Sequence, residues 1–247
     1  MPSRRPRRKC YTLNTRMEEQ VISKERVADH GEVLTAKREV EAMLDLVKQE
    51  TERIESRFLE PACGNGNFLT AILERKLAVV ERRYGKSQLE FERYAFAAVA
   101  SLYGIDILAD NVSQCRERLF AVFDAVYERL FPQTSTAGCR DAIRFVLAHN
   151  IVWGDALKFE TGGETPKPIV FPEWAFVQGS LVKRRDFSFG GLVEHENTRE
   201  ALLIPEPKNG SQEQMSLFAE VAQDDYNPKP VADYPPVSFL EIAHVQR

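Results

Sequence analysis

The sequence predicts an α/β fold, in which a parallel sheet carries helices on both of its faces. Between residues 35 and 155, short apolar stretches alternate with longer segments of helical periodicity. This alternation is typical of parallel strands joined by crossover helices. The chain has 247 residues, 43% of them hydrophobic, which is enough to bury the core of one such domain with a modest appendage.

The first predicted helix and strand precede a turn that contains two glycines. Apolar residues recur at three- and four-residue steps after Thr35, a residue type that favours the helix N-cap; they are Val40, Met43, Leu44 and Val47. The apolar pair Phe58-Leu59 then predicts the end of a strand, and the turn PACGNGN follows at 61–67.

Helices and strands continue to alternate up to residue 155. In chain order, the patterns predict a helix over 68–84, a helix over 87–101, a strand over 103–107, a helix over 108–130, a helix over 139–148 and a strand that ends at Asp155. The helix over 108–130 has the clearest apolar stripe. Pro132 ends this helix, since proline cannot continue the hydrogen-bond ladder.

The chain changes character after residue 156. Aromatic and β-branched residues dominate 169–189, and the turn residues 178–180 lie among them, so this segment predicts a hairpin. Residues 205–236 are rich in Pro, Asn, Gln, Asp and Gly, with one helical pattern near 215–221. We therefore expect three parts, which are a basic arm over 1–30, a main domain over 31–195 and a loop-rich C-terminal extension over 196–247.

Charge is distributed unevenly along the chain. The net charge is −4, yet residues 1–9 hold five basic residues and no acidic one, which leaves 28 of the 33 basic residues against 37 acidic ones elsewhere. An arginine-rich arm can bind nucleic-acid phosphates by releasing counterions. A solvated tail without a partner is the alternative. The acidic remainder is not typical of a protein that wraps duplex DNA on its own.

Cysteine spacing and hydropathy exclude several classes of protein. Cys10, Cys63, Cys115 and Cys139 lie far apart and form no CxxC pair, which argues against a zinc site and against a disulfide framework. No apolar run approaches the roughly 18 residues that span a bilayer, and the basic N-terminus lacks the apolar segment of a secretory signal. We therefore expect a reduced, cytoplasmic protein without a metal or a membrane anchor.

Acidic residues end all three predicted strands beside the glycine turn. They are Glu60, Asp106 and Asp155, and the turn contains Gly64 and Gly66. Glycine lets the backbone approach a ligand closely, and ligands of open α/β sheets bind at the carboxyl ends of the strands. We therefore expect the three acids to line one crevice next to the turn. The alternative is that each acid only caps the helix that follows its strand.

Each strand-end acid has a role that suits a nucleoside ligand. The Asp106 carboxylate is placed to accept hydrogen bonds from both hydroxyls of a ribose, and Asp155 is placed to accept from the exocyclic amine of an adenine. Glu60, next to the glycine turn, would order that turn or hold an ammonium group.

These motifs resemble those of a known family. FLEPACGNGNFLTAIL is similar to the cofactor motif of S-adenosylmethionine-dependent DNA adenine-N6 methyltransferases, which usually begins with Asp where Glu60 stands. HGEVLTAKREVEAMLDLV resembles the N-terminal cofactor motif of that family, with Ala36 where proline is usual. YGIDI and NIVWGDAL resemble its ribose and adenine motifs. The resemblance covers about residues 30–157.

The resemblance implies a Rossmann-like class I methyltransferase sheet within residues 31–195 and S-adenosylmethionine as cofactor. The residues that it implies for cofactor binding are Thr35, Glu60, Pro61, Ala62, Gly64, Gly66, Asn67, Asp106, Ile107, Asp155 and Ala156. It also implies duplex DNA with an adenine target as substrate. The chain is short of a target-recognition domain, so the resemblance further implies a partner subunit.

The catalytic tetrapeptide of that family, Asp/Asn-Pro-Pro-aromatic, is missing or divergent here. FPEW at 171–174 is the best candidate, with Pro172, Glu173 and Trp174 as tentative catalytic residues. Trp174 would stack on a flipped-out base, and the alternative for this residue is packing in the hairpin core. Two further fragments, NPKP at 227–230 and DYPP at 233–236, contain the right residue types in the wrong order.

Three functions follow from these observations. The first is a DNA adenine-N6 methyltransferase of a modification or phage-defence system that acts with a partner subunit. The second is a catalytically inactive S-adenosylmethionine-binding subunit that serves as a scaffold or sensor. The third is another nucleotide binder such as an NAD-dependent enzyme; GNGNFLT lacks the third glycine of a dinucleotide fingerprint, which disfavours it.

Overall fold

The structure is a computed structural model that describes residues 35–193 and 228–246. The chain divides into two compact units, residues 1–36 and residues 37–247, and the fold below is that of the second unit. The predicted helix near 215–221 and the basic arm lie outside the described residues. Among the residues that are described, no helix combines the length and the apolar character needed to cross a membrane.

A parallel sheet forms the centre of the α/β fold. Its strands β1 (Phe58–Glu60), β2 (Leu102–Asp106) and β3 (Ile151–Asp155) run in the order β1-β2-β3, and the short β4 (Glu160–Thr161) continues it antiparallel to β3. Every residue of β2 is buried, because this strand has a neighbour on each side and helices on its faces. Within the described ranges, β1 pairs with β2 alone and so forms one edge of the sheet.

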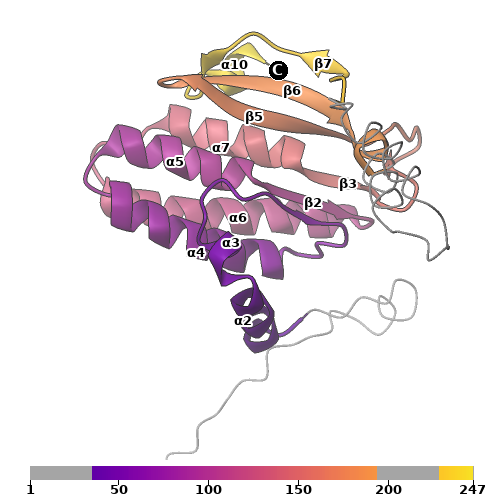
Figure 1. The fold of residues 1–247 in the computed structure, drawn as a ribbon, viewed down its shortest axis with the longest axis horizontal. Coiled ribbons are helices and arrows are strands. Elements are labelled where there is room, and N and C mark those ends of the chain that lie inside the picture. Colours follow the sequence, from indigo (N-terminus) through magenta and orange to yellow (C-terminus); the bar gives the residue numbers. More distant parts are fainter. Residues whose placement is uncertain (1–34, 194–227, 247) are drawn as a thin grey trace, which may run out of the picture. The chain divides into compact units, whose positions relative to one another are not determined.

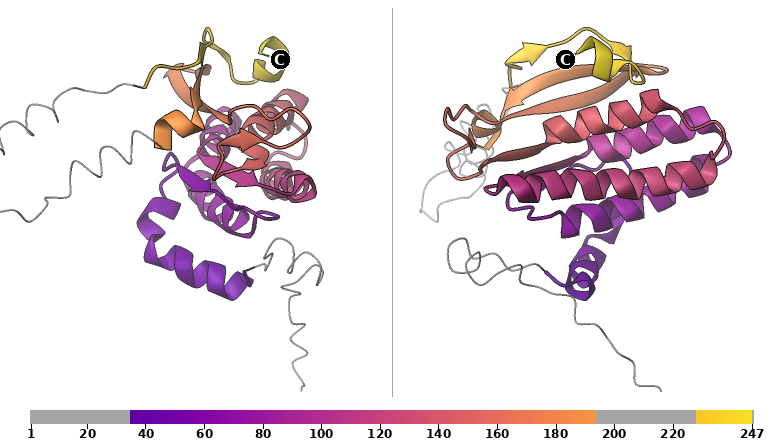
Figure 2. Two further views of the ribbon diagram at one scale, coloured as in Figure 1. Left: turned by 90° about the vertical axis from the view of Figure 1, so that its right-hand side faces the viewer. Right: turned by 180° about the vertical axis from the view of Figure 1, so that it is seen from behind.

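Four long helices surround the parallel sheet. They are α4 (Asn67–Tyr84), α5 (Gln88–Ala100), α6 (Ala109–Leu130) and α7 (Ala137–Asn150). Strand β2 contacts all four, α4 packs on α6, and α5 packs on α7. The helices are longer than the strands, so beyond the sheet α4 also packs on α5 and α6 on α7 (Figures 1 and 2). The predicted α/β class is confirmed.

A second, antiparallel sheet covers the α5–α7 pair. It consists of the hairpin β5 (Val170–Gln178) and β6 (Leu181–Ser188), with β7 (Ala232–Asp233) and β8 (Val237–Ser238) both paired to β6. The predicted hairpin is confirmed, and its turn contains Gly179 at φ 54°. Strand β5 contacts both helices, while α10 (Ile242–Val245) packs on α7 (Figure 1). The end of the loop-rich extension is therefore part of this sheet.

Two short helices precede β1. They are α2 (Lys37–Leu46) and α3 (Lys48–Thr51). Val40 and Leu44 of α2 are buried at the four-residue spacing that the sequence predicted, and α2 packs on α4. Arg75 of α4 fixes this contact, because its Nη2 lies 2.6 Å from Glu41 Oε2 and 2.8 Å from Asp45 Oδ1.

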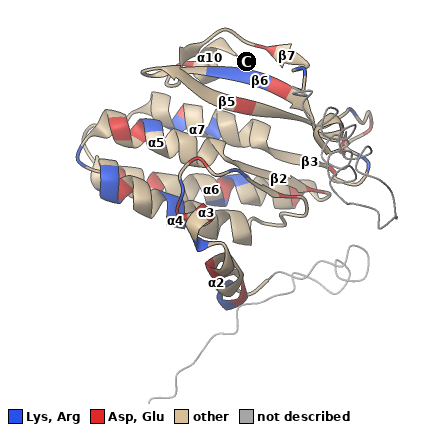
Figure 3. Cartoon of the chain, in the orientation of Figure 1, with Lys and Arg blue, Asp and Glu red and all other residues tan. Residues whose placement is uncertain are grey.

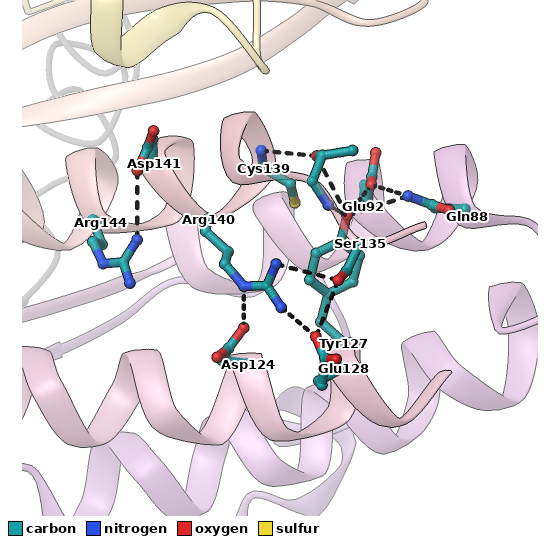
Figure 4. A network of polar contacts seen from close by, with 11 residues as sticks. Gln88, Glu92, Asp124, Tyr127, Glu128, Ser135, Cys139, Arg140, Asp141 and Arg144 are labelled. Atoms are coloured by element: carbon teal, nitrogen blue, oxygen red, sulfur yellow. Dashed lines mark hydrogen bonds and ion pairs between the residues drawn. The ribbon is translucent and has the colours of Figure 1, made fainter. Parts of the chain in front are cut away.

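A buried polar network joins α5, α6 and α7 at one end of the helices (Figure 4). Tyr127 donates its hydroxyl to the buried Glu92, and it accepts from the Thr136 backbone N–H at 2.9 Å. Burial and the Glu92 carboxylate raise the pKa of Tyr127 to about 12. Arg140 adds an ion pair to Asp124 at 2.6 Å. Elsewhere, acidic and basic side chains are interspersed along the helices (Figure 3).

A buried lysine holds the segment before β1 against the helices. Lys76 of α4 is fully buried, and its Nζ donates to Ile54 O at 3.1 Å, to Ser56 O and to Ser101 Oγ. Its three acceptors come from two segments that are distant in sequence. Burial lowers the pKa of Lys76 from 10.5 to about 7, because a low-polarity surrounding disfavours the charged amine.

We predict that Lys76→Met lowers the free energy of unfolding by about 2 kcal/mol at pH 7, because the carbonyls of residues 54 and 56 lose their donor inside the protein. Chemical denaturation measures this change, and the exposed Lys86→Met serves as the matched control.

The same pair of proteins tests the lowered pKa of Lys76. The folded-state pKa of about 7 lies below the unfolded value, so between pH 7 and about 10 the unfolded chain binds the extra proton. Raising the pH through that window therefore stabilises the wild type relative to Lys76→Met. A stability difference that stays constant over this window contradicts the assignment.

Candidate functional site

The glycine turn adopts a backbone that requires glycine at two positions. Gly64 has φ 52° and Gly66 has φ 90°, values that residues with a Cβ adopt only with strain. A Cβ on Gly66 would also lie 2.6 Å from Cys115 Sγ of α6. The second glycine therefore permits both the direction of the turn and the close packing of α4 against α6.

Asp106 joins the end of β2 to the glycine turn. Its Oδ2 accepts from the Gly64 backbone N–H at 2.8 Å, and its Oδ1 accepts from the Leu108 N–H at 2.9 Å and from Asn111 Nδ2 at 3.2 Å. The side chain is only 8% exposed. The turn and the carboxyl end of β2 therefore form one structural unit, and both the predicted ligand role and the capping alternative involve the same carboxylate.

The hydrogen bonds of Asp106 limit what a ligand can gain from it. A carboxylate offers about four acceptor positions, and three are already used. Oδ2 accepts from one of these donors and Oδ1 from two. The sequence predicted that this carboxylate accepts from both hydroxyls of a ribose, and that role stays a prediction.

Arg118 of α6 fixes the glycine turn from the other side. Its Nη1 donates to Asn65 O at 2.8 Å, to Asn65 Oδ1 at 2.7 Å and to Asn67 Oδ1 at 2.8 Å. Sequence reasoning did not find this residue, because Arg118 lies about 50 positions away in an otherwise ordinary polar helix face. Through these contacts, the two asparagines of GNGN hold the turn against α6.

Cys63 of the turn lies against Cys115 of α6. Cys63 and Cys115 are both buried with free thiols, and a hydrogen bond between them, together with burial, raises the pKa of Cys63. Both buried side chains therefore pack as small apolar groups. Their separation in sequence concealed this pair.

Glu60 and Asp155 occupy the strand ends on either side of Asp106. Because β1, β2 and β3 are parallel neighbours, their carboxyl ends lie at the same end of the sheet, here called the carboxyl end. Burial raises the pKa of Glu60, opposed by a hydrogen bond from the Ala62 N–H. Asp155 Oδ1 accepts from the Leu157 N–H at 2.9 Å and from the Lys158 N–H at 3.2 Å. The Lys158 side chain is the main cause that lowers the pKa of Asp155.

Exposed apolar side chains accompany these acids. Ile107 is 55% exposed, Trp153 is 40% exposed and Leu157 is 91% exposed. Trp153 Nε1 donates to Ile107 O at 3.0 Å, so two of the three groups lie together. Apolar surface beside hydrogen-bonding carboxylates is typical of sites for small ligands with a planar ring. The residues predicted from the sequence include Ile107 but neither Trp153 nor Leu157.

The other predicted cofactor residues are divided between the two compact units of the chain. Pro61 and Ala62 are exposed on the turn, Asn67 begins α4, and Ala156 is half-buried after β3. Thr35 belongs to the unit of residues 1–36, so its placement relative to the turn is not described. Apart from Thr35, the predicted cofactor residues thus end or follow the three parallel strands, and their role in binding stays a prediction.

The FPEW segment lies on strand β5 of the antiparallel sheet. Its backbone carbonyl at Pro172 accepts from Tyr103 Oη at 2.8 Å. Trp174 Nε1 donates to Asn150 Oδ1 at 2.9 Å, and the indole ring packs edge-on against Phe96. The Trp174 ring is therefore held by hairpin core contacts in this structure.

Glu173 is shared between two arginines. Its carboxylate pairs with Arg57 at 2.7 Å and with Arg185. Burial opposes the charged form, but the two guanidinium groups outweigh it and lower the pKa of Glu173. All three tentative catalytic residues thus have partners inside the protein, and their role in catalysis stays a prediction.

A cavity of about 560 Å³ lies between the edge strand β1 and the hairpin. Pro172 and Glu173 line it together with Tyr103, Arg57 and the apolar residues Phe58, Leu59, Phe171, Phe187 and Phe189. This volume suits a small organic ligand. The predicted tetrapeptide therefore borders a real cavity, although its fourth residue, Trp174, packs against the helices instead.

The two alternative fragments lie on or near β7. Asp233 pairs with Lys183 at 3.0 Å, and the Arg184 guanidinium lies 4.6 Å from the Tyr234 ring centre. In the NPKP fragment, Asn227 lies outside the described residues. Asp233 of the DYPP fragment thus belongs to the antiparallel sheet, and residues 228–230 of the NPKP fragment precede β7.

A scan of protein-family models, a search of curated proteins and a search of solved structures find no match to this chain. Among residues 35–193 and 228–246, no group of three or more His, Cys, Asp or Glu side chains could hold a metal ion.

We predict that Gly66→Ala lowers the free energy of unfolding by about 2–4 kcal/mol, because left-handed strain adds to the clash with Cys115. The matched control is Gly179→Ala, which has φ 54° and no atom within 4 Å of an added Cβ, so it shows strain alone. Thermal and chemical denaturation measure both. Adding Cys115→Ala should restore part of the loss in Gly66→Ala; equal losses at the two glycines would contradict the packing argument.

Proposed function

We propose that this chain binds S-adenosylmethionine as part of a DNA adenine-N6 methyltransferase of a modification or phage-defence system, in which a partner subunit participates. The observation that carries the proposal is the 2.8 Å hydrogen bond from the Gly64 N–H to Asp106. It joins a glycine turn of the methyltransferase type to the strand end that resembles a ribose motif. A Rossmann-like class I sheet is the corresponding fold proposal.

The side chains at the carboxyl end of the sheet suit the chemical groups of such a cofactor. The open acceptor position of Asp106 suits one ribose hydroxyl, and the desolvated Glu60 carboxylate suits the ammonium of a methionyl group. Ile107 and Trp153 offer apolar surface for a purine ring. Asp155 would accept from the adenine amine with the lone pairs that Leu157 and Lys158 leave. When bound, the cofactor supplies an electrophilic methyl group.

The second candidate, a subunit that binds cofactor without catalysing transfer by itself, is favoured by the contacts of FPEW. Methyl transfer to adenine needs hydrogen-bond acceptors for the N–H groups of the target amine. These acceptors make the lone pair of the amine nitrogen more available for attack on the methyl group. The Pro172 carbonyl and the Glu173 carboxylate already accept from Tyr103, Arg57 and Arg185. A partner that provides the missing acceptors and the target-reading surface reconciles both candidates.

The basic arm supports a DNA substrate. Residues 1–9 of this arm hold five positive charges and no negative one, and they lie outside the described residues, so the support comes from composition. Such an arm would add affinity for duplex phosphates without reading sequence, leaving recognition of the adenine site to the partner.

We predict that the purified chain binds S-adenosylmethionine and that Asp106→Ala weakens binding by about 1.5–3 kcal/mol, the range for hydrogen bonds to charged groups. Isothermal titration calorimetry measures both proteins. Asp141→Ala on α7 removes the same charge away from the turn and serves as control. No binding by wild type at millimolar cofactor would end the methyltransferase proposal.

We further predict little or no methyl transfer by the chain alone, because removing one positioned acceptor typically costs about 10²–10³ in rate. The assay is transfer of tritiated methyl groups to genomic DNA that lacks adenine methylation. Robust turnover would contradict the need for a partner. In that case Glu173→Gln and Trp174→Ala should both suppress it if FPEW is catalytic.

A further inference from the structure

Arg93 is a half-buried cation that has no hydrogen-bond acceptor among the residues that the structure describes. Its guanidinium lies 5.5 Å from the Tyr94 ring centre and 5.0 Å from that of Phe176. Its Nε is buried and has no hydrogen-bond partner, and among the described residues the side chain forms no ion pair. The two rings orient the guanidinium, but an aromatic face does not replace the oxygen acceptors that its N–H groups require.

The other arginines of comparable burial all have oxygen acceptors. This set of half-buried or buried arginines consists of Arg75, Arg116, Arg118, Arg140, Arg184 and Arg185, which contact carboxylates, backbone carbonyls or amide oxygens. Leaving one such cation unpaired costs free energy. Arg93 is the exception within the part of the chain that the structure describes.

Arg93 lines a cavity of about 440 Å³ that contains two further arginines, Arg53 and Arg57. The walls come from α5, from the segment before β1, from the start of β2 near Ser101 and from β5. This cavity lies at the amino ends of β1 and β2, whereas the glycine turn lies at their carboxyl ends. The two sites are therefore separate.

Carboxylates near this cavity leave an excess of positive charge. Arg53 lies 3.6 Å from Glu50, and Glu173 serves both Arg57 and Arg185. Glu55 also lines the cavity. The lining itself thus holds three arginines and one carboxylate, and within the described ranges Arg93 forms no ion pair with any carboxylate.

We propose that this cavity binds a phosphate group, with Arg93 as its principal ligand. The guanidinium fork matches the oxygens of a phosphate, and Arg is well suited to hold them because it stays charged and stacks on aromatic rings. Arg53 lines the same cavity, and its largely exposed ion pair with Glu50 leaves further N–H groups of its guanidinium for the same ligand. The phosphate belongs either to a small phosphoryl ligand or to a nucleic-acid backbone.

The first experiment uses inorganic phosphate and pyrophosphate as probes, against chloride at equal ionic strength. The variant is Arg93→Met, which keeps the packed stem between the two rings, and the control is Arg82→Met, an exposed arginine of α4. Wild type and control should show saturable binding by calorimetry and a raised melting temperature. Arg93→Met should bind at least tenfold more weakly. Equal affinity for Arg93→Met and wild type overturns the proposal.

The second experiment distinguishes the two sources of the phosphate. Binding of a short DNA duplex is followed by fluorescence anisotropy at several salt concentrations. If a DNA backbone supplies the phosphate, Arg93→Met lowers the magnitude of the slope of log K against log salt by about 1, which corresponds to the loss of one phosphate contact. An unchanged slope with lost phosphate binding assigns a small phosphoryl ligand. If neither probe distinguishes Arg93→Met from Arg82→Met, Arg93 is a packing residue and the proposal fails.

Discussion

The hydrogen bond between the Gly64 N–H and the Asp106 carboxylate is the constraint on which the candidate site depends. It links a turn with two glycines in the left-handed region to the end of β2, a strand that contacts all four long helices. Arg118 fixes the same turn from α6. The turn is thus held in place before any ligand arrives, so little ordering cost falls on binding.

The same middle strand connects the two halves of the fold. Asp106 ends β2 at the turn, while Tyr103, three residues earlier, donates to the backbone of FPEW. Asn150 adds a second link, since its side chain donates to Leu102 O and accepts from Trp174. The hairpin is therefore anchored to the central sheet, and a rearrangement of FPEW would break contacts on both β2 and α7.

Local patterns predicted the elements well. The amphipathic stripe over 108–130 and the turn residues 178–180 correspond to α6 and to the β5–β6 hairpin, because periodicity and turn chemistry are local properties. The strand-end acids were found for the same reason. The Arg118 contact and the Cys63–Cys115 pair were not, since they join residues about 50 positions apart and depend on how α6 packs. Pairing of β7 and β8 with β6 was likewise hidden within a loop-rich composition.

The most direct test of the central claim is the NMR spectrum of the ¹⁵N-labelled chain titrated with S-adenosylhomocysteine, the demethylated cofactor. If the glycine turn and the end of β2 form one cofactor site, the amide signals of Gly64, Gly66 and Ile107 shift together along one saturation curve, while the Arg93 amide stays unchanged. Absence of any shift in these three amides at millimolar ligand, or shifts confined to other parts of the chain, would contradict the account.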